Sequence, residues 1–269
     1  MELICPVCGM KLEQTESAMV CPNRHSFDIA RQGYVNLLTV QQKHSLNPGE
    51  TREQVVSRRE FLEAGYYAPI AQTLFETAQE LGAQGPVLDI GCGEGYYTSA
   101  VADSLDSATL TAVDISKHAI ASACKRKTEG NIDYAVASVY ALPCPDGYFD
   151  TVISVFSPFA REEFLRVLKE NGILISVIPQ RRHLYSLKCA IYDDPYENEV
   201  QPYEVEGFEL IDSADLSYDF TLTSNQAIAD LFSMTPYYYR TPKSGHERLA
   251  ALSELKCEAQ FTVLVYKKK

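Results

Sequence analysis

The sequence predicts an α/β fold in which helices cover both faces of a mostly parallel sheet, preceded by a small metal-binding module. Two observations support this prediction. From Pro86 onward, short runs of β-forming residues alternate with segments of helical periodicity, and such alternation is typical of a parallel sheet. Before that point, four side chains of the kind that bind metals fall within the first 25 residues. A chain of 269 residues has room for one large domain and one small module.

Seven strands are expected, because each is a short apolar or alternating run bounded by turn residues. They cover residues 87–90, 110–113, 132–136, 149–155, 173–178, 206–216 and 260–266. Helices are expected where apolar residues recur every three or four positions, as with Ile70, Leu74 and Ala78. They cover residues 51–64, 67–81, 96–105, 116–126, 161–169, 181–190 and 225–232. Gly65 ends the first of these helices.

The formal net charge is −12, from 24 Lys and Arg against 36 Asp and Glu, but it is unevenly distributed. Residues 189–239 contain no Lys or Arg and eleven acids, which are Asp193, Asp194, Glu197, Glu199, Glu204, Glu206, Glu209, Asp212, Asp215, Asp219 and Asp230. The rest of the chain has a net charge of −1, so the overall acidity does not exclude RNA as a partner. We expect this acidic block to form either the surface of a homodimer or a face kept away from RNA.

Basic side chains gather in two stretches that suit contacts with phosphates. Residues 24–59 contain six basic side chains against three acidic ones. The second stretch is formed by Arg181, Arg182 and Lys188. The alternative for both stretches is a solvated helix face or helix end.

Further features predict a cytoplasmic protein without a membrane partner. No apolar run approaches the roughly 20 residues of a membrane span. The first six residues lack the basic and apolar regions of a signal peptide. Eight cysteines in such a chain indicate a reducing compartment, where thiols stay free or bind a metal.

Four of the potential ligands form the pattern Cys5-x2-Cys8-x12-Cys21-x3-His25. Two closely spaced pairs of soft or borderline ligands suit tetrahedral zinc. Because the protein would fill all four positions, no position is left for a reacting water, and we expect one structural zinc ion. The alternative is that these are scattered core cysteines, which is the better interpretation for the other five.

A glycine-rich turn, Asp89-Ile90-Gly91-Cys92-Gly93-Glu94-Gly95, joins the expected strand 87–90 to the following helix. Its glycines allow a tight turn and the close approach of a ligand to the backbone. Asp89 makes the turn acidic, which disfavours a pyrophosphate, and Asp114 ends the next strand, where a carboxylate can bind ribose hydroxyls. These features favour S-adenosylmethionine over a dinucleotide. The alternative is an ordinary strand–helix turn of an α/β domain.

Longer stretches of the chain resemble a known family. Residues 87–98 resemble the first motif of class I (Rossmann-like) S-adenosylmethionine-dependent methyltransferases. Together with the Cys/His quartet, residues 25–38, 58–67 and 182–184 are similar to the bacterial 23S ribosomal RNA (guanine-N1-)-methyltransferases, and the resemblance spans nearly the whole chain. It implies the seven-stranded class I methyltransferase sheet and methylation of one guanine in a hairpin of 23S rRNA.

The resemblance also implies roles for single residues. The zinc ligands would be Cys5, Cys8, Cys21 and His25, and the methyl donor would be surrounded by Tyr67, Asp89, Gly91, Gly93, Glu94, Gly95, Asp114 and His183. Tyr67 has a second interpretation as a core tyrosine, and His183 as a surface histidine. The chain departs from the class I pattern at Ser138, where many members carry an acid that contacts adenine. The usual Pro-Gly-Gly turn is replaced by Glu170-Asn171-Gly172.

The sequence suggests three regions. We expect residues 1–36 to form a zinc-binding RNA-recognition module, residues 37–85 a helical connector that contributes to the cofactor site, and residues 86–269 the methyltransferase domain. Ser157-Pro158-Phe159 are expected to line the pocket for the target base. N1 of guanine carries a proton that must leave, and the sequence does not identify a base that removes it.

Two other functions fit the same motifs. One is a methyltransferase of small molecules in which zinc serves only stability. The other is a zinc-dependent RNA-binding protein whose methyltransferase domain is inactive.

Overall fold

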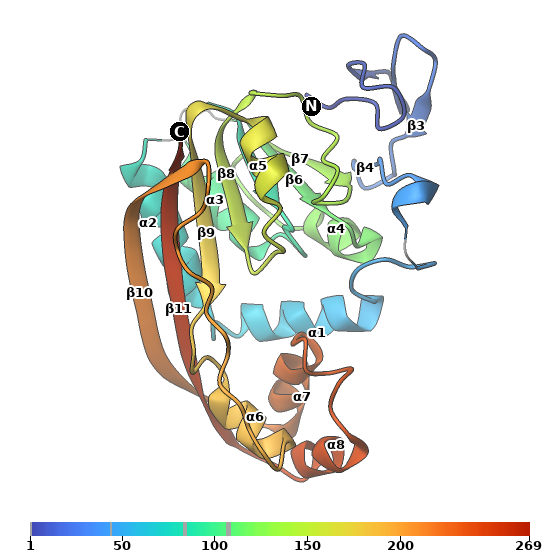
Figure 1. Cartoon of the computed structure of the whole chain (residues 1–269). Helices are drawn as coiled ribbons and strands as arrows, with labels where there is room; N and C mark the ends of the chain where they lie inside the picture. The colour runs from blue at the N-terminus through green and yellow to red at the C-terminus, as the bar shows by residue number, and fades with distance from the viewer. Residues whose placement is uncertain (1, 44, 83–84, 106–108) are drawn as a thin grey trace.

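The computed structural model describes residues 2–43, 45–82, 85–105 and 109–269 and contains a small and a large sheet (Figure 1). The small sheet, on the N-terminal side, consists of β1 (Glu13–Gln14), β2 (Ala18–Val20) and β3 (Ser26–Asp28), with antiparallel pairing. The elements that lead from it to the large sheet are β4 (Val35–Asn36), η1 (Val40–Gln42), α1 (Arg52–Glu63) and α2 (Ala68–Glu80).

The large sheet contains all seven expected strands, in the order β10-β11-β9-β8-β5-β6-β7, with β4 beyond β7. They are β5 (Val87–Ile90), β6 (Leu110–Asp114), β7 (Ile132–Val136), β8 (Phe149–Val155), β9 (Leu168–Pro179), β10 (Phe208–Leu222) and β11 (Leu255–Lys268). Neighbours among β4 to β9 pair in parallel, whereas β11 is antiparallel to both β9 and β10. The mostly parallel α/β fold is therefore confirmed.

The eighth strand, β4, comes from the segment that follows the small sheet. Val35 pairs with Ala135 and Asn36 with Val136 of β7. Two residues are too few to show the alternation of a strand, which is why the sequence predicted seven strands. The N-terminal part of the chain thus completes one edge of the large sheet.

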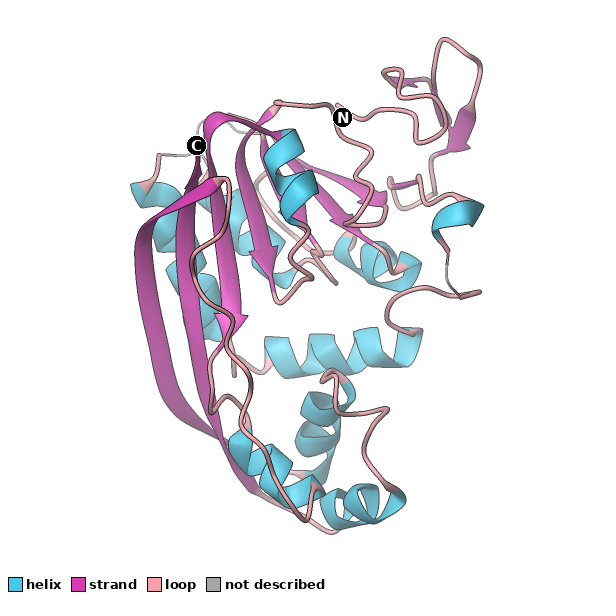
Figure 2. Cartoon of the chain, viewed as in Figure 1, coloured by secondary structure: helices cyan, strands magenta, loops and turns pink. Residues whose placement is uncertain are grey.

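The other edge is formed by β10, which is longer than expected. β10 and β11 form one antiparallel ribbon, which Figure 2 shows reaching past the parallel strands toward the C-terminal helices. Exposed side chains along β10 include Glu209, Asp212 and Asp219 of the acidic block. Charges on an edge strand oppose pairing with another chain.

The remaining helices are α3 (Tyr96–Ser104), α4 (Lys117–Ala123), α5 (Arg161–Val167), α6 (Tyr185–Ile191), α7 (Asn225–Ser233) and α8 (Lys243–Ala250). The helix expected from residue 181 begins only at Tyr185, because Leu184 has a left-handed backbone conformation with φ of 55°. The helix expected over 161–169 ends at Val167, where β9 begins. α8 was not expected. Figure 1 shows α1 between the sheet and the helices α7 and α8.

Buried side chains fill both faces of the large sheet. One cluster includes Ile70 and Leu74 of α2, packed against strand residues such as Ile153. The cluster on the opposite face joins Leu3 and Met19 of the N-terminal part to the strands. The N-terminal part therefore shares its core with the sheet. Among the residues with described positions, no helix is both long and apolar enough to cross a membrane.

Candidate functional site

The four predicted metal ligands converge beside the small sheet. Cys8 Sγ lies 3.6 Å from Cys21 Sγ, and His25 Nδ1 lies 3.5 Å from Cys5 Sγ and 3.4 Å from Cys21 Sγ. All four ligand atoms are within 4.8 Å of one another. Zinc bonds of about 2.3 Å to sulfur and about 2.0 Å to nitrogen place tetrahedral ligands about 3.5–3.8 Å apart. Both the chemistry and the spacing of this donor set fit zinc.

Two tight turns bring the ligands together. Gly9 N–H donates to Cys5 O, and Arg24 N–H donates to Cys21 O, both at 2.8 Å. Gly9 and Arg24 have φ of 72° and 64°, the left-handed conformation in which such a turn ends. A hydrogen bond from the Met10 backbone lowers the pKa of the Cys8 thiol to about 6, which favours the thiolate that a metal binds.

A cavity of about 270 Å³, here called the first cavity, lies beside the glycine-rich turn. It opens where β5, β6 and β8 end, the edge at which parallel α/β sheets bind ligands. Its lining residues are Glu50, Arg58, Leu62, Gly91, Cys92, Gly93, Glu94, Tyr96, Tyr97, Asp114, Ile115, Ser138, Val139, Tyr140, Val155, Phe156, Ser157 and Pro158.

Gly91 and Gly93 of the turn differ in the space around the position that a Cβ would occupy. Gly91 and Gly93 have φ of 73° and 55°, a conformation that glycine adopts without steric cost. A Cβ on Gly91 would also lie 2.5 Å from Ser157 Oγ, whereas a Cβ on Gly93 would meet nothing closer than Arg58 Cδ at 4.0 Å. Gly91 is therefore required by packing, and Gly93 leaves open space for a ligand.

Two aspartates hold the turn in different ways. Asp114 lines the cavity, and its two oxygens accept hydrogen bonds from Gly93 N–H at 3.0 Å and Ser116 N–H at 2.7 Å. Each oxygen keeps a lone pair for a ligand hydroxyl. Asp89 lies buried behind the turn and accepts a hydrogen bond from Thr98 Oγ1 at 2.6 Å. Burial raises the pKa of Asp89 to about 7.

The other two carboxylates of the first cavity are paired with arginines. Arg126 Nε and Nη2 donate to the two oxygens of Glu94, both at 2.8 Å. Arg58 Nε donates to Glu50 Oε2 at 2.9 Å. Sequence reasoning missed Glu50 and Arg58 as lining residues of the cavity. Arg58 carried a signal as part of the basic stretch 24–59, whereas Glu50 carried none.

A second cavity of about 380 Å³ adjoins the first and shares Arg58, Phe156 and Ser157 with it. Its other lining residues are Tyr67, Val177, Ile178, Pro179, His183, Leu184, Asn198, Leu231, Met234, Thr235, Pro236 and Tyr237. At the junction, the Phe156 side chain is 38% exposed, and Ser157 Oγ is buried without a hydrogen-bond partner among the described residues. An exposed ring and an unpaired hydroxyl are both available to a ligand.

Backbone strain is concentrated in the same place. Phe156 and Leu184 both have φ of 55°, and both line the second cavity. The left-handed conformation is unfavourable for bulky side chains, and strain of this kind is found mainly at functional sites.

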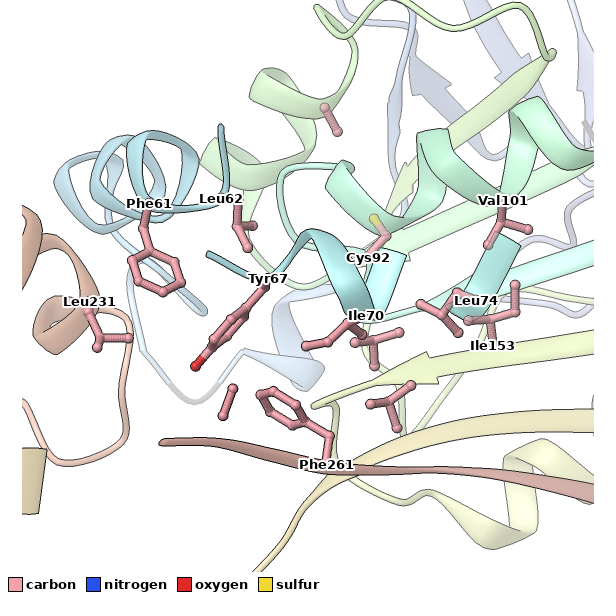
Figure 3. Packing of buried hydrophobic residues seen from close by; sticks show 14 of the residues in the cluster. Phe61, Leu62, Tyr67, Ile70, Leu74, Cys92, Val101, Ile153, Leu231 and Phe261 are labelled. Atoms are coloured by element: carbon pink, nitrogen blue, oxygen red, sulfur yellow. The ribbon is translucent and has the colours of Figure 1, made fainter. Parts of the chain in front are cut away.

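Tyr67 and His183 form a buried pair in the wall of the second cavity. Tyr67 Oη lies 3.3 Å from His183 Nε2. Figure 3 shows Tyr67 between Phe61 and Phe261, and the ring centroids are 4.9 Å and 5.2 Å away. Because Gln260 N–H donates to His183 Nδ1 at 3.4 Å, a neutral ring carries its hydrogen on Nε2 and donates it to Tyr67. Burial lowers the pKa of His183 to about 3, so the ring is neutral, and the Tyr67 hydroxyl is left to donate to a ligand.

The structure divides the residues predicted to surround the methyl donor into three groups. They lie in the first cavity (Gly91, Gly93, Glu94 and Asp114), in the second cavity (Tyr67 and His183), or in the turn without lining either cavity (Asp89 and Gly95). Ser138 and Ser157 line the first cavity, as does Pro158.

Two family models match this chain, one over the zinc module and one over the domain that contains the glycine-rich turn. The family model described as RlmA, N-terminal, a zinc ribbon, matches residues 3–46, and the model described as Methyltransferase domain matches residues 87–172. The fold and the first cavity define an S-adenosylmethionine-dependent methyltransferase that carries a zinc ribbon.

Full-length relatives define the group more narrowly. A relative from Micromonospora griseorubida, named for 23S rRNA (guanine-N(1)-) methylation, is 34% identical over 94% of this chain and 92% of its own. The 23S rRNA (guanine(748)-N(1))-methyltransferase of Streptomyces fradiae is 32% identical over 97% of this chain and 95% of its own. A Bacillus subtilis relative named for the same reaction as the first is 33% identical over 96% of this chain. This chain belongs to the family of 23S rRNA (guanine-N1-)-methyltransferases.

Proposed function

We propose that this chain transfers the methyl group of S-adenosylmethionine to N1 of a guanine in a hairpin of 23S rRNA. The observation that carries this proposal is the junction of the two cavities at Phe156 and Ser157. A donor bound beside the glycine-rich turn and a base bound in the second cavity would meet there. Catalysis would then consist mainly in aligning donor and acceptor.

The first cavity would hold S-adenosylmethionine. Asp114 would accept hydrogen bonds from the ribose hydroxyls, and the open space over Gly93 would admit the donor close to the backbone. Glu94 and Gly91 would shape the cavity, whereas Asp89 and Gly95 would support the turn from behind. Asp114, whose carboxylate accepts from two backbone amides, disfavours a phosphate beside the turn and is compatible with a ligand that has none.

The second cavity would hold the target guanine. N1 lies on the Watson–Crick edge of the base, so the nucleotide must be unpaired or turned out of its helix. The exposed Phe156 ring suits stacking on a base, and Ser157 Oγ and Tyr67 Oη have hydrogen-bonding capacity to spare. Tyr67 and His183 would thus contact the target base, close to the methyl group of the donor.

The N-terminal module would recognise the RNA. Residues 1–36, held by zinc, the basic stretch 24–59, and Arg181 and Arg182 would contact the hairpin, with the connector 37–85 and the domain 86–269 placing the base. Lys188, the third member of the second basic stretch, is fully buried and does not reach phosphates. The acidic edge formed by β10 would face away from the RNA. A cytoplasmic location is part of this proposal, because the proposed substrate is ribosomal RNA. A homodimer stays a prediction that mass measurement in solution would check.

Transfer of labelled methyl groups from S-adenosylmethionine to an unmodified 23S rRNA transcript tests the proposal. We expect N1-methylguanine at one position in the wild-type reaction and none with Asp114→Ala. Label found only in small molecules would favour the alternative substrate class. RNA binding without label in either pool would favour an inactive domain, and both results would contradict the proposal.

A further inference from the structure

Methylation of guanine at N1 poses a proton problem. In the neutral base N1 carries a hydrogen and has no free lone pair in the ring plane. The nitrogen becomes nucleophilic when this proton leaves, and the deprotonated ring carries a negative charge shared with O6. An enzyme can supply a base for the proton, or it can stabilise the anion.

The described residues of the second cavity offer no good base. None of its lining residues is a carboxylate. The titratable groups that line it are Arg58, Tyr67, His183 and Tyr237. Burial raises the pKa of both phenols, so they keep their protons, and a histidine with a pKa of about 3 is a weak base. The carboxylates of the first cavity are already engaged with arginines or backbone amides.

A buried lysine lies directly behind this cavity. Lys188 of α6 has no exposed surface. Its Nζ donates to Asn198 Oδ1 at 2.7 Å and to Tyr196 O at 3.0 Å, and lies 4.1 Å from the centroid of the Tyr196 ring. Burial lowers the pKa of Lys188, whereas these partners, which are acceptors and a ring face, favour the ammonium ion. Asn198 Oδ1 also accepts from Tyr237 Oη at 3.2 Å, and Asn198 Nδ2 donates to Gln180 O at 2.9 Å and to His183 O at 3.1 Å. Asn198 and Tyr237 both line the second cavity, so Lys188 lies directly behind its wall.

The charge of Lys188 has no carboxylate partner within ion-pair distance among the residues whose positions the structure describes. The charged groups on the elements packed around α6 are engaged elsewhere. Glu258 of β11 accepts from Ser186 Oγ at 2.6 Å, Asp193 pairs with Arg248 of α8 at 2.9 Å, and Glu197 pairs with Arg182 at 3.4 Å. Arg58 of α1, at the far wall, pairs with Glu50.

The field of Lys188 reaches the cavity wall. After burial, the charge of Lys188 is the next cause of the lowered pKa of His183. A cation without a counterion is costly to bury unless it is compensated when the ligand binds. An anionic base in the second cavity would provide that compensation.

We propose that the charge of Lys188, directly behind the cavity wall that Asn198 and Tyr237 form, stabilises the N1-deprotonated form of the target guanine in the second cavity. This inference rests on the proposed function. The N1 proton passes to solvent, and the N1 lone pair then forms the bond to the methyl carbon. The bond between that carbon and sulfur breaks, its electron pair stays on sulfur, and the donor leaves as a neutral thioether. Lys188 is not a catalytic residue, since its charge acts across the cavity wall and its amine touches neither the base nor the donor.

Single-turnover methylation of an unmodified 23S rRNA transcript between pH 6 and pH 10 tests this role. The Lys188→Met variant removes the charge and keeps much of the side-chain volume. The rate should rise with pH as the target guanine loses its N1 proton. In the variant this rising limb of the pH–rate profile should move to higher pH by about one unit. We therefore expect a rate about tenfold lower at neutral pH that approaches the wild-type rate at the alkaline end. Lys256→Met, which removes an exposed lysine of β11, should leave the profile unchanged.

Each outcome decides one question. A rate that falls by the same factor at every pH would mean a structural role only, and would overturn the inference. Failure of the wild-type enzyme to form N1-methylguanine would overturn the proposed function itself and the inference with it. If Lys188→Met does not fold, Lys188→Gln, which is neutral but keeps an amide donor for the acceptors around Lys188, should move the rising limb of the pH–rate profile in the same direction. An unmoved limb in that variant would also contradict the inference.

Discussion

The two cavities differ in how the chain builds them. In the first cavity, the glycine-rich turn and Asp114 follow two neighbouring strands, and backbone conformation and a few short hydrogen bonds set their geometry. Other lining residues, such as Arg58 and Ser138, come from elsewhere in the chain. The second cavity is assembled from residues of α1, β9 and α7, from the residues next to α2, β8 and α6, and from the segments around residues 198 and 234–237. Recognition of a common cofactor is thus encoded locally, whereas recognition of a specific base depends on tertiary assembly. This difference predicts that substitutions in the two cavities have separable effects.

The largest effect is expected for Gly91→Ala. The added Cβ would collide with Ser157 in a conformation already unfavourable for alanine, and we expect affinity for S-adenosylmethionine to fall by about 100-fold, roughly 3 kcal/mol. Titration calorimetry measures this loss. Gly147→Ala is the control, because Gly147 has φ of 55° but no atom within 4 Å of its added Cβ. Equal losses in both variants would contradict a specific role of the Gly91 contact.

Loss of zinc is expected to reduce methylation of RNA strongly and to leave cofactor binding nearly unchanged. Cys21→Ser removes one of four ligands, and the metal supplies much of the folding free energy of such a module. We expect methylation of RNA to fall by at least about tenfold, with affinity for S-adenosylmethionine changed less than about twofold. Metal content, cofactor affinity and methylation would be measured together. Cys189→Ser, at an exposed cysteine outside the site, should change none of them.

A smaller effect is expected for Tyr67→Phe. The variant loses the hydroxyl that the Tyr67–His183 pair offers to the second cavity, so turnover with RNA should fall by about tenfold while cofactor affinity stays the same. Tyr218→Phe, which loses a hydrogen bond to Tyr66 O, should lose stability but keep its turnover. If Tyr67→Phe instead weakens cofactor binding, the hydroxyl acts on the methyl donor and the separation of the cavities is incomplete.

The smallest effect on RNA turnover is expected for Ser157→Ala, and this variant should be more stable than the wild type. Removing a buried hydroxyl that has no partner should raise the free energy of unfolding by up to about 1 kcal/mol, while RNA turnover falls about threefold. Ser186→Ala should be destabilising, because its Oγ donates to Glu258 at 2.6 Å. Thermal unfolding and turnover of both variants check the pair, and a destabilised Ser157→Ala would mean that the hydroxyl has a partner in solution.

Much of the fold could be predicted because its strands and helices show their periodicity over several residues. β4 is too short for that, and its pairing with β7 is a long-range contact. α8 was missed because Gly245 lies within it. A Cβ at that position would approach Ile191 O to 2.6 Å, so the glycine serves the packing of α8 on α6 and not the end of a helix.

The sites divide in the same way. The zinc quartet and the glycine-rich turn could be predicted because their ligands are close in sequence. Tyr67 and His183 are 116 residues apart, and only the resemblance to a family singled them out. The pairing of Arg58 with Glu50, and the unpaired hydroxyl of Ser157, depend on side-chain geometry that no spacing encodes.

The short strand β4 has a consequence for the order in which the chain folds. Val35 pairs with Ala135, a residue synthesised one hundred positions later. The zinc ribbon therefore emerges from the ribosome and can bind its ion well before its partner strand exists. The sheet edge at β7 stays open until β4 docks, and an open edge is a site for misassembly with other chains. Removal of the ribbon together with β4 would leave the catalytic domain with that open edge, and we expect such a truncated chain to aggregate more readily than the full chain.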